Sequence, residues 1–140
     1  LPIKSVTVMV QKEAADRLCA PMPSRECGAV TAAVRYYSEP RTLFPVSRGS
    51  FCPAPNVDSA VIRLDVKEQL PLGPEEEKTL FRVVKAAFGQ RRKTLPNTLS
   101  AGLGIPKAEA AEKLAAAGLK PTARAEELSL EEFCRLAKEF

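Results

Sequence analysis

The sequence predicts an α/β part over residues 1–70 followed by an all-α part over residues 71–140. Two observations predict this order. In the first part, short runs of apolar and β-branched residues have the period of two that is typical of strands. In the second part, apolar residues recur every three or four positions, as they do along one face of a helix. The period changes at a connector rich in proline and glycine, residues 69–74, and we expect the domain boundary there.

Strands are predicted in several segments of the first part. Residues 6–10 form a short apolar run, which is typical of a buried strand in a parallel sheet. Residues 29–37 are rich in Val, Thr and Tyr and predict a second strand, and residues 43–46 predict a short third one. Over residues 57–66 every second position is apolar, which predicts a strand with one buried face.

Helices are predicted mainly in the second part. A short helix over residues 14–19 ends at the prolines that follow it. Further helices are expected over residues 75–88, 94–101, 107–117 and 130–137. The last of these has a capping box, Ser129 with Glu132, ahead of its apolar positions.

The composition excludes several kinds of chemistry. The 140 residues contain no histidine, so histidine-based catalytic triads and the common zinc patterns are ruled out. The cysteines are Cys19, Cys27, Cys52 and Cys134. They form no C-x-x-C pair, so we expect small apolar core residues in a reducing cytosol and no metal site. The net charge of +4 leans mildly towards polyanionic partners.

Two further features bear on location and completeness. No apolar run approaches the ~20 residues of a membrane span and no signal peptide is visible, so we expect a soluble cytoplasmic protein without a membrane partner. The sequence begins Leu1-Pro2 and enters an apolar strand almost at once. We therefore expect a fragment of a longer protein.

The most informative segment is residues 51–57, which lead into the strand predicted over residues 57–66. Pro53 and Pro55 fix their own φ and hold the residues before them extended, so the segment should be a rigid arm. Such an arm fixes the direction of Phe51. The aromatic ring can then stack on a planar ligand, or it can fill a core or a domain interface.

A second conspicuous segment carries three consecutive cations, Arg91, Arg92 and Lys93, after a glycine break between two predicted helices. Three cations that diverge around a helix start suit a phosphate backbone, and each contact adds salt-dependent affinity. A solvated helix start is the alternative interpretation, because clusters of this size are common on surfaces.

Polar residues at two strand ends are weaker candidates. Residues 11–13, Gln-Lys-Glu, end the first predicted strand on the side where open α/β sheets bind ligands. An exposed polar strand end explains them equally well. Asp58 and Ser59 lie where the proline-rich arm becomes strand, and we expect their side chains to satisfy free backbone groups there.

Three motifs together resemble a known family. They are Val-Met-Val-Gln-Lys-Glu over residues 8–13, Phe-x-Pro-x-Pro-x-Val-Asp-Ser-Ala-Val over residues 51–61, and Phe-x-Gln-Arg-Arg-Lys-Thr-Leu over residues 88–95. In this order they resemble the KsgA-type (RsmA) ribosomal RNA adenine dimethyltransferases, through essentially the whole chain. The resemblance implies that residues 1–70 hold the C-terminal strands of a Rossmann-like class I methyltransferase domain. It implies a small helical RNA-binding domain over residues 71–140.

The resemblance also implies a reaction. In that family, S-adenosylmethionine donates methyl groups to the N6 amino groups of two adjacent adenosines in the 3′-terminal hairpin of 16S rRNA, during small-subunit biogenesis. A stacked adenine must be extruded for this chemistry. The resemblance implies that Phe51 stacks on the target adenine, which is worth about 1–3 kcal/mol per base. It implies that Arg91, Arg92 and Lys93 contact rRNA in the small ribosomal subunit.

Two departures from the family pattern limit what this chain is expected to do. Position 96 is proline, where family members often carry a cation. The glycine-rich donor motif and the Asn-Leu-Pro-Tyr-like motif, which accepts hydrogen bonds from the target amino group, are both absent. Gly102-Leu-Gly104 sits in a helical region and does not replace the first. We therefore expect no cofactor-binding residue here and no methyl transfer by the fragment alone.

Two other functions stay open. An Erm-like methyltransferase that acts on 23S rRNA shares the aromatic loop and the reaction, although the residues after the loop and the basic segment argue against it. A non-catalytic RNA-binding or ribosome-assembly module would act by occupancy alone. A reading frame that continues upstream into the missing motifs would favour the enzyme, and a start codon near Leu1 would favour the module.

Overall fold

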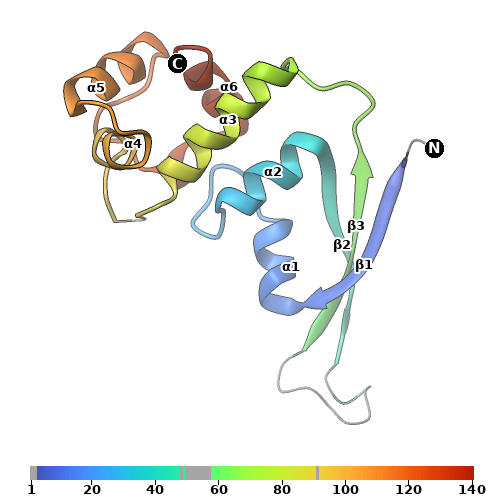
Figure 1. Cartoon of the computed structure of the whole chain (residues 1–140). Coiled ribbons are helices and arrows are strands. Elements are labelled where there is room, and N and C mark those ends of the chain that lie inside the picture. Colours follow the sequence, from blue (N-terminus) through green and yellow to red (C-terminus); the bar gives the residue numbers. More distant parts are fainter. Residues whose placement is uncertain (1–2, 48, 50–57, 91) are drawn as a thin grey trace.

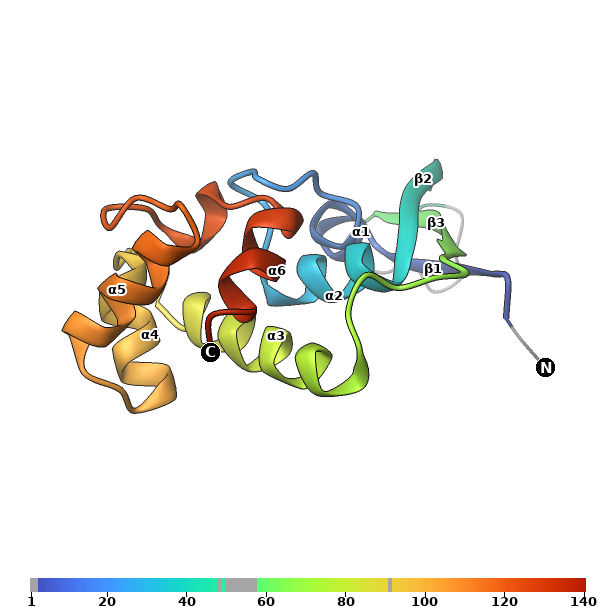
Figure 2. The same cartoon turned by 90° about the horizontal axis from the view of Figure 1, so that it is seen from above.

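The sheet and most of the helices lie at opposite ends of the molecule (Figure 1). The computed structural model describes residues 3–47, 49, 58–90 and 92–140. Within these residues the chain is mixed α/β, with two helices, α1 (Lys12–Leu18) and α2 (Ala29–Tyr37), beside a three-stranded sheet. α2 lies between the sheet and the helices that follow, as Figure 2 also shows.

The central strand of the sheet is the last one in sequence. β3 (Ser59–Val66) pairs with β1 (Ser5–Gln11) on one side and with β2 (Ser38–Val46) on the other. Both pairings are antiparallel, with Val8 opposite Ile62 and Thr42 opposite the same residue. Strands are thus confirmed at three of the predicted places. The prediction of a parallel sheet was wrong for the described residues, because an apolar run looks the same in either kind of pairing.

The first strand is also less buried than its sequence predicts. The side chains of Val8 and Met9 are 37% and 52% exposed in the described structure. The buried side of the sheet is instead the face of β3 under α1, where Ala15, Ala60 and Ile62 form a small core. Apolar side chains of β1 are therefore part of the exposed surface of the described structure.

The strand predicted over residues 29–37 is wrong, because this segment is helix α2. Its Val, Thr and Tyr residues favour strands only weakly, and packing overrides such preferences. Ala32 and Tyr36 lie one helical turn apart and are both fully buried against the helices behind. The helix start is held locally: the Thr31 hydroxyl accepts from the Gly28 N–H at 3.0 Å and donates to the Arg17 carbonyl at 2.6 Å.

The second half is helical, as predicted. Its elements are α3 (Pro74–Ala87), α4 (Leu95–Leu103), α5 (Lys107–Ala116), the short 3-10 helix η2 (Ala125–Glu127) and α6 (Leu130–Ala137). The capping box is confirmed, since the Glu132 N–H donates to the Ser129 hydroxyl at 3.2 Å and the Ser129 N–H donates to the Glu132 carboxylate at 3.0 Å. No helix in the described part of the chain is long and apolar enough to cross a membrane.

Tyr36 joins the two parts of the chain. It lies before the predicted boundary at residue 70, yet it belongs to the main core formed by α3 to α6. Its hydroxyl donates to the Leu72 carbonyl at 3.5 Å, and its ring meets the Phe81 ring edge-on with centroids 5.6 Å apart. The neighbouring Tyr37 donates to the Glu77 carboxylate at 3.0 Å. These contacts fix α2 against α3, so α2 connects the part of the chain that holds the sheet to the main core of the helices.

Candidate nucleic-acid interface

β2 ends and β3 begins at the same end of the sheet. Val46, the last residue of β2, pairs with Ser59, the first residue of β3. Gln11, the last residue of β1, pairs with Ser59 from the other side. The Lys12 N–H also donates to the Asp58 carbonyl at 2.9 Å, which ties the start of α1 to the end of the arm. The carboxyl end of β1 therefore lies beside the base of the segment between β2 and β3 (Figure 1).

This end of the sheet brings together residues that are far apart in the sequence. The side chains of residues 11–13 and of Asp58 are exposed there, whereas Ser59 is buried. Phe51, Pro53 and Pro55 lie outside the described residues, so the stacking role of Phe51 stays a prediction. What the structure adds is that the polar end of β1 lies at the same edge of the sheet as the end of β2 and the start of β3.

The basic segment is held at both ends by the helical core. At its start, Phe88 packs against Phe133 with ring centroids 5.7 Å apart. At its end, the fully buried Leu95 donates its N–H to the Ala123 carbonyl at 2.9 Å. Between them, Arg92 and Lys93 are exposed and form no salt bridge with a described residue, while Arg91 lies outside the described residues. The two described cations are thus free to meet an anion from solution.

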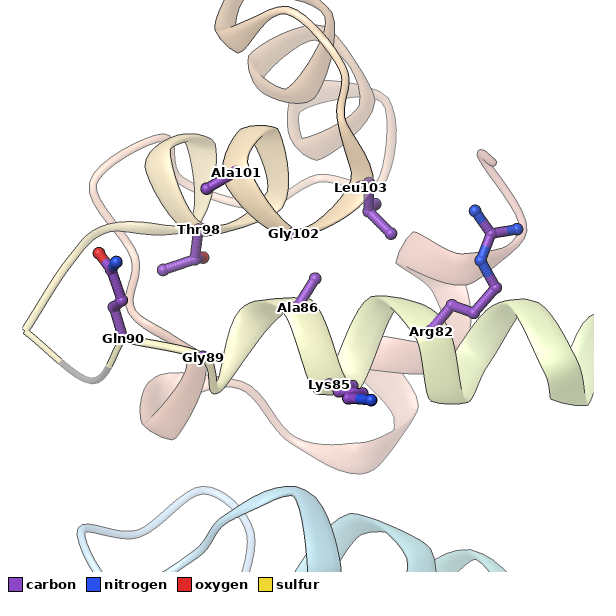
Figure 3. Close-up of a pocket in the computed structure, with 9 residues that line it drawn as sticks. All are labelled: Arg82, Lys85, Ala86, Gly89, Gln90, Thr98, Ala101, Gly102 and Leu103. Carbon is purple, nitrogen blue, oxygen red and sulfur yellow. The ribbon is translucent and has the colours of Figure 1, made fainter.

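A groove next to this segment brings in two cations that sequence analysis missed. It lies between α3 and α4 and has a volume of about 440 Å³. Arg82 and Lys85 come from α3, Gln90 from the turn, and Thr98 and Ala101 from α4 (Figure 3). Arg82, Lys85 and Gly89 follow one another at helical spacing, which is a sequence signal for a shared face. That α4 would lie across this face could not be seen without the fold.

Charge is divided along α3. Glu75, Glu76 and Glu77 occupy its first turn, where the helix dipole favours anions, and Lys85 lies in its last turn, where the dipole favours cations. Among the described residues that line the groove, none is acidic. The C-terminal half of α3 and the basic segment therefore form one cationic region.

The described glycines do not form a site for a nucleotide-like donor. In Gly102-Leu103-Gly104, a Cβ at position 102 would lie 2.5 Å from the Ala86 Cβ, so Gly102 serves helix packing. Gly104 has φ of 68° and is the left-handed C-cap of α4. Neither glycine follows a parallel strand, as a donor-binding turn requires. Gly102 and Gly104 therefore do not form a donor-binding turn.

The family of the chain is decided by a match over its whole length. A family model described as ribosomal RNA adenine dimethylase matches residues 1–140. The chain belongs to this ribosomal RNA adenine dimethylase family. The resemblance read from the three sequence motifs is thereby confirmed.

Curated relatives of this dimethylase chain are named as methyltransferases of small-subunit ribosomal RNA. A "Ribosomal RNA small subunit methyltransferase A" of Geobacillus thermodenitrificans is 46% identical over 140 residues, which covers 98% of this chain and 48% of the relative. A protein of the same name from Desulfitobacterium hafniense is 48% identical over 131 residues, covering 94% of this chain and 47% of that protein. The chain spans about half the length of the curated relatives it matches.

Solved structures show the same fold. A dimethyladenosine transferase from Plasmodium falciparum has a TM-score of 0.80 at 24% identity, covering 96% of this chain and 56% of that chain. The 23S rRNA methyltransferase ErmE has a TM-score of 0.67 at 22% identity, covering 98% of this chain and 55% of that chain. At these identities the likeness concerns the fold of the dimethylase chain and not its substrate.

Proposed function

We propose that this chain is the rRNA-docking and base-stacking part of a small-subunit ribosomal RNA adenine dimethyltransferase. The observation that carries the proposal is the shared edge: β2 ends and β3 begins at the same edge of the sheet as the carboxyl end of β1. We infer that this edge faces the reacting base. The whole enzyme would transfer methyl groups from S-adenosylmethionine to two adjacent adenosines in the 3′-terminal hairpin of 16S rRNA.

Phe51 is the residue that we assign to the target base. The N6 amino group of an adenine cannot be reached while the base is stacked in RNA, so the base must be turned out of its helix. A flipped base loses its stacking partners, and an aromatic face replaces part of that loss, worth about 1–3 kcal/mol per base. Phe51 follows β2 and precedes β3 in the arm, so its position in the chain suits this role.

We further propose that β1, β3 and β2 are one edge of a larger Rossmann-like sheet over residues 1–70. Supporting this, β1 has a hydrogen-bonded neighbour on one side only among the described strands, and its Val8 and Met9 are exposed. A strand at the edge of a sheet has unpaired N–H and C=O groups, and a further strand can pair with them and cover exposed apolar side chains. Residues 71–140 would then form the helical RNA-binding domain.

The basic segment supplies the contacts that bring the RNA. Arg91, Arg92 and Lys93 follow α3, and the two described members are exposed and not held by salt bridges to described residues. Each lysine or arginine that neutralises a phosphate releases counterions, which makes binding strong at low salt and weak at high salt. Contacts to phosphates position the protein without reading the sequence.

Two binding measurements on the chain test the proposal. Fluorescence anisotropy should show salt-dependent binding to the 3′-terminal hairpin of 16S rRNA, because the cationic region is present. Calorimetry with S-adenosylmethionine should show no binding, because the glycine-rich donor motif is absent from the sequence. Absence of RNA binding at low salt would contradict the docking role. Clear micromolar binding of S-adenosylmethionine would contradict the proposal that this chain does not bind the donor.

A further inference from the structure

The groove between α3 and α4 is the strongest unassigned feature of the molecule. It is lined by residues from Arg82 to Gln90, which cover the last turns of α3 and the turn that follows it. Figure 3 shows Arg82 at the Leu103 end of the groove and Gln90 facing Thr98 at the other end. Small residues line the middle, where Gly102 lies over Ala86. The groove therefore has small residues in its middle and is cationic on its α3 side.

The side chains of the groove suit a sugar-phosphate backbone. Arg82 and Lys85 are exposed and form no salt bridge with a described residue. The amide of Gln90 offers two donors. Thr98 is only 3% exposed, and its hydroxyl donates to the Leu95 carbonyl at 3.2 Å, so it forms part of the groove wall.

We propose that this groove holds a second stretch of rRNA backbone, next to the one met by the basic segment. Arg82 and Lys85 each contact a phosphate, and Gln90 contacts the sugar-phosphate chain at the other end of the groove. The inference rests on the proposed function, because it assumes that the chain docks on rRNA. It deepens that function by extending the RNA-binding surface from the turn after α3 along the helix itself.

The test compares two double variants of the full 140-residue chain with the unaltered chain. The groove variant is Arg82→Gln with Lys85→Gln, which removes both charges and keeps good helix formers. The matched control is Lys120→Gln with Lys138→Gln, two exposed lysines outside the groove and without salt bridges to described residues. Both variants lose the same net charge. Circular dichroism and thermal unfolding check that both remain folded.

Binding to the 3′-terminal hairpin of 16S rRNA with its flanking single strand is measured over a series of salt concentrations. The groove variant should bind about tenfold more weakly, and its salt slope should fall by about two contacts. The affinity and salt slope of the control variant should change far less, because its two lysines lie outside the groove and act on the RNA only through long-range attraction. Equal effects of the two variants would overturn the inference.

A charge placed inside the groove gives an independent readout. Ala101 is exposed on the α4 side of the groove. Ala101→Lys should tighten RNA binding and raise the salt slope by about one contact, and Ala101→Glu should weaken binding. If neither change affects binding, the inference is wrong.

The outcomes separate the inference from the proposed function. If the unaltered chain fails to bind the hairpin at low salt, the proposed function fails. If the unaltered chain binds, and alanine at positions 91–93 weakens it while the groove variants match their control, only the groove assignment fails.

Discussion

Gly102 of α4 lies against Ala86 of α3 so closely that a Cβ at position 102 would come within 2.5 Å of the Ala86 Cβ. Real Cβ atoms do not approach one another to this distance, so the two helices meet here only because position 102 lacks a side chain. The contact sets the width of the groove that Arg82 and Lys85 line. It also makes position 102 a sensitive probe of the α3–α4 packing.

Gly102→Ala should therefore destabilise the fold. The added methyl group must push α4 away from α3, and overpacking of this kind costs about 1–3 kcal/mol. Urea unfolding followed by circular dichroism measures the change. Gly49→Ala is the matched control, since its added Cβ would meet only the Ser47 hydroxyl at 3.7 Å. Equal stability of the two variants would show that the helices do not pack as closely as described.

Tyr36 should make the stability depend on alkaline pH. The pKa of Tyr36 is raised from 10.0 to about 12, and burial of its hydroxyl is the largest cause. Burial also raises the pKa of Tyr37. The folded state therefore keeps the Tyr36 proton in a pH range where the unfolded chain has released it. Stability from this group is complete below pH 10.0 and is lost as the pH rises towards about 12.

The measurement is urea unfolding at several alkaline pH values, with Tyr36→Phe for comparison. Phenylalanine keeps the ring contacts with Phe81 and loses only the hydroxyl, whose bond to the Leu72 carbonyl is long at 3.5 Å. The variant should be slightly less stable near neutral pH, by about 0.5–1.5 kcal/mol, and should lose less stability on alkaline titration. An unchanged alkaline dependence in Tyr36→Phe would rule out Tyr36 as the cause.

Replacement of Arg91, Arg92 and Lys93 by alanine should weaken binding to the rRNA hairpin and flatten its salt dependence by up to about three phosphate contacts. The exposed positions of Arg92 and Lys93 make a loss of folding unexpected. A salt titration of the binding constant measures the slope. An unchanged slope would remove the basic segment from the RNA interface.

Phe51 is tested in a hybrid enzyme, in which this chain is joined to the part of the Geobacillus thermodenitrificans relative that it does not match. Phe51→Ala should lower methyl transfer by about 5- to 150-fold, the rate equivalent of a lost stacking contact. Phe51→Tyr keeps an aromatic face and should retain most of the activity. If alanine and tyrosine reduce methyl transfer equally, the ring does not act by stacking.

The sequence predicted those elements whose signals are local. The alternation of residues 57–66 marked β3 to within two residues, and Ser129 with Glu132 marked the start of α6. It failed for α2, where β-branched and aromatic residues are helical because Ala32 and Tyr36 pack on a core formed by residues much later in the chain. The direction of strand pairing for β1 also depends on a partner some fifty residues away, which its own apolar run does not encode.

The candidate site divides in the same way. The basic segment was visible because its three cations are adjacent in the sequence. Arg82 and Lys85 were missed because they became part of a groove only when α4 folded across α3. The shared edge of Gln11, Lys12 and Asp58 likewise needed the sheet, since these residues meet only through the pairing of β1 with β3.

Methyl transfer by the hybrid enzyme is the most direct test of the central claim that this chain directs a methyltransferase to small-subunit rRNA. The assay offers S-adenosylmethionine with unmethylated small ribosomal subunits or with 23S rRNA, and maps the products. The account predicts dimethylated adenosines at two adjacent positions in the 3′-terminal hairpin of 16S rRNA, and none in 23S rRNA. A folded hybrid that binds the donor yet methylates 23S rRNA, or neither RNA, would contradict it.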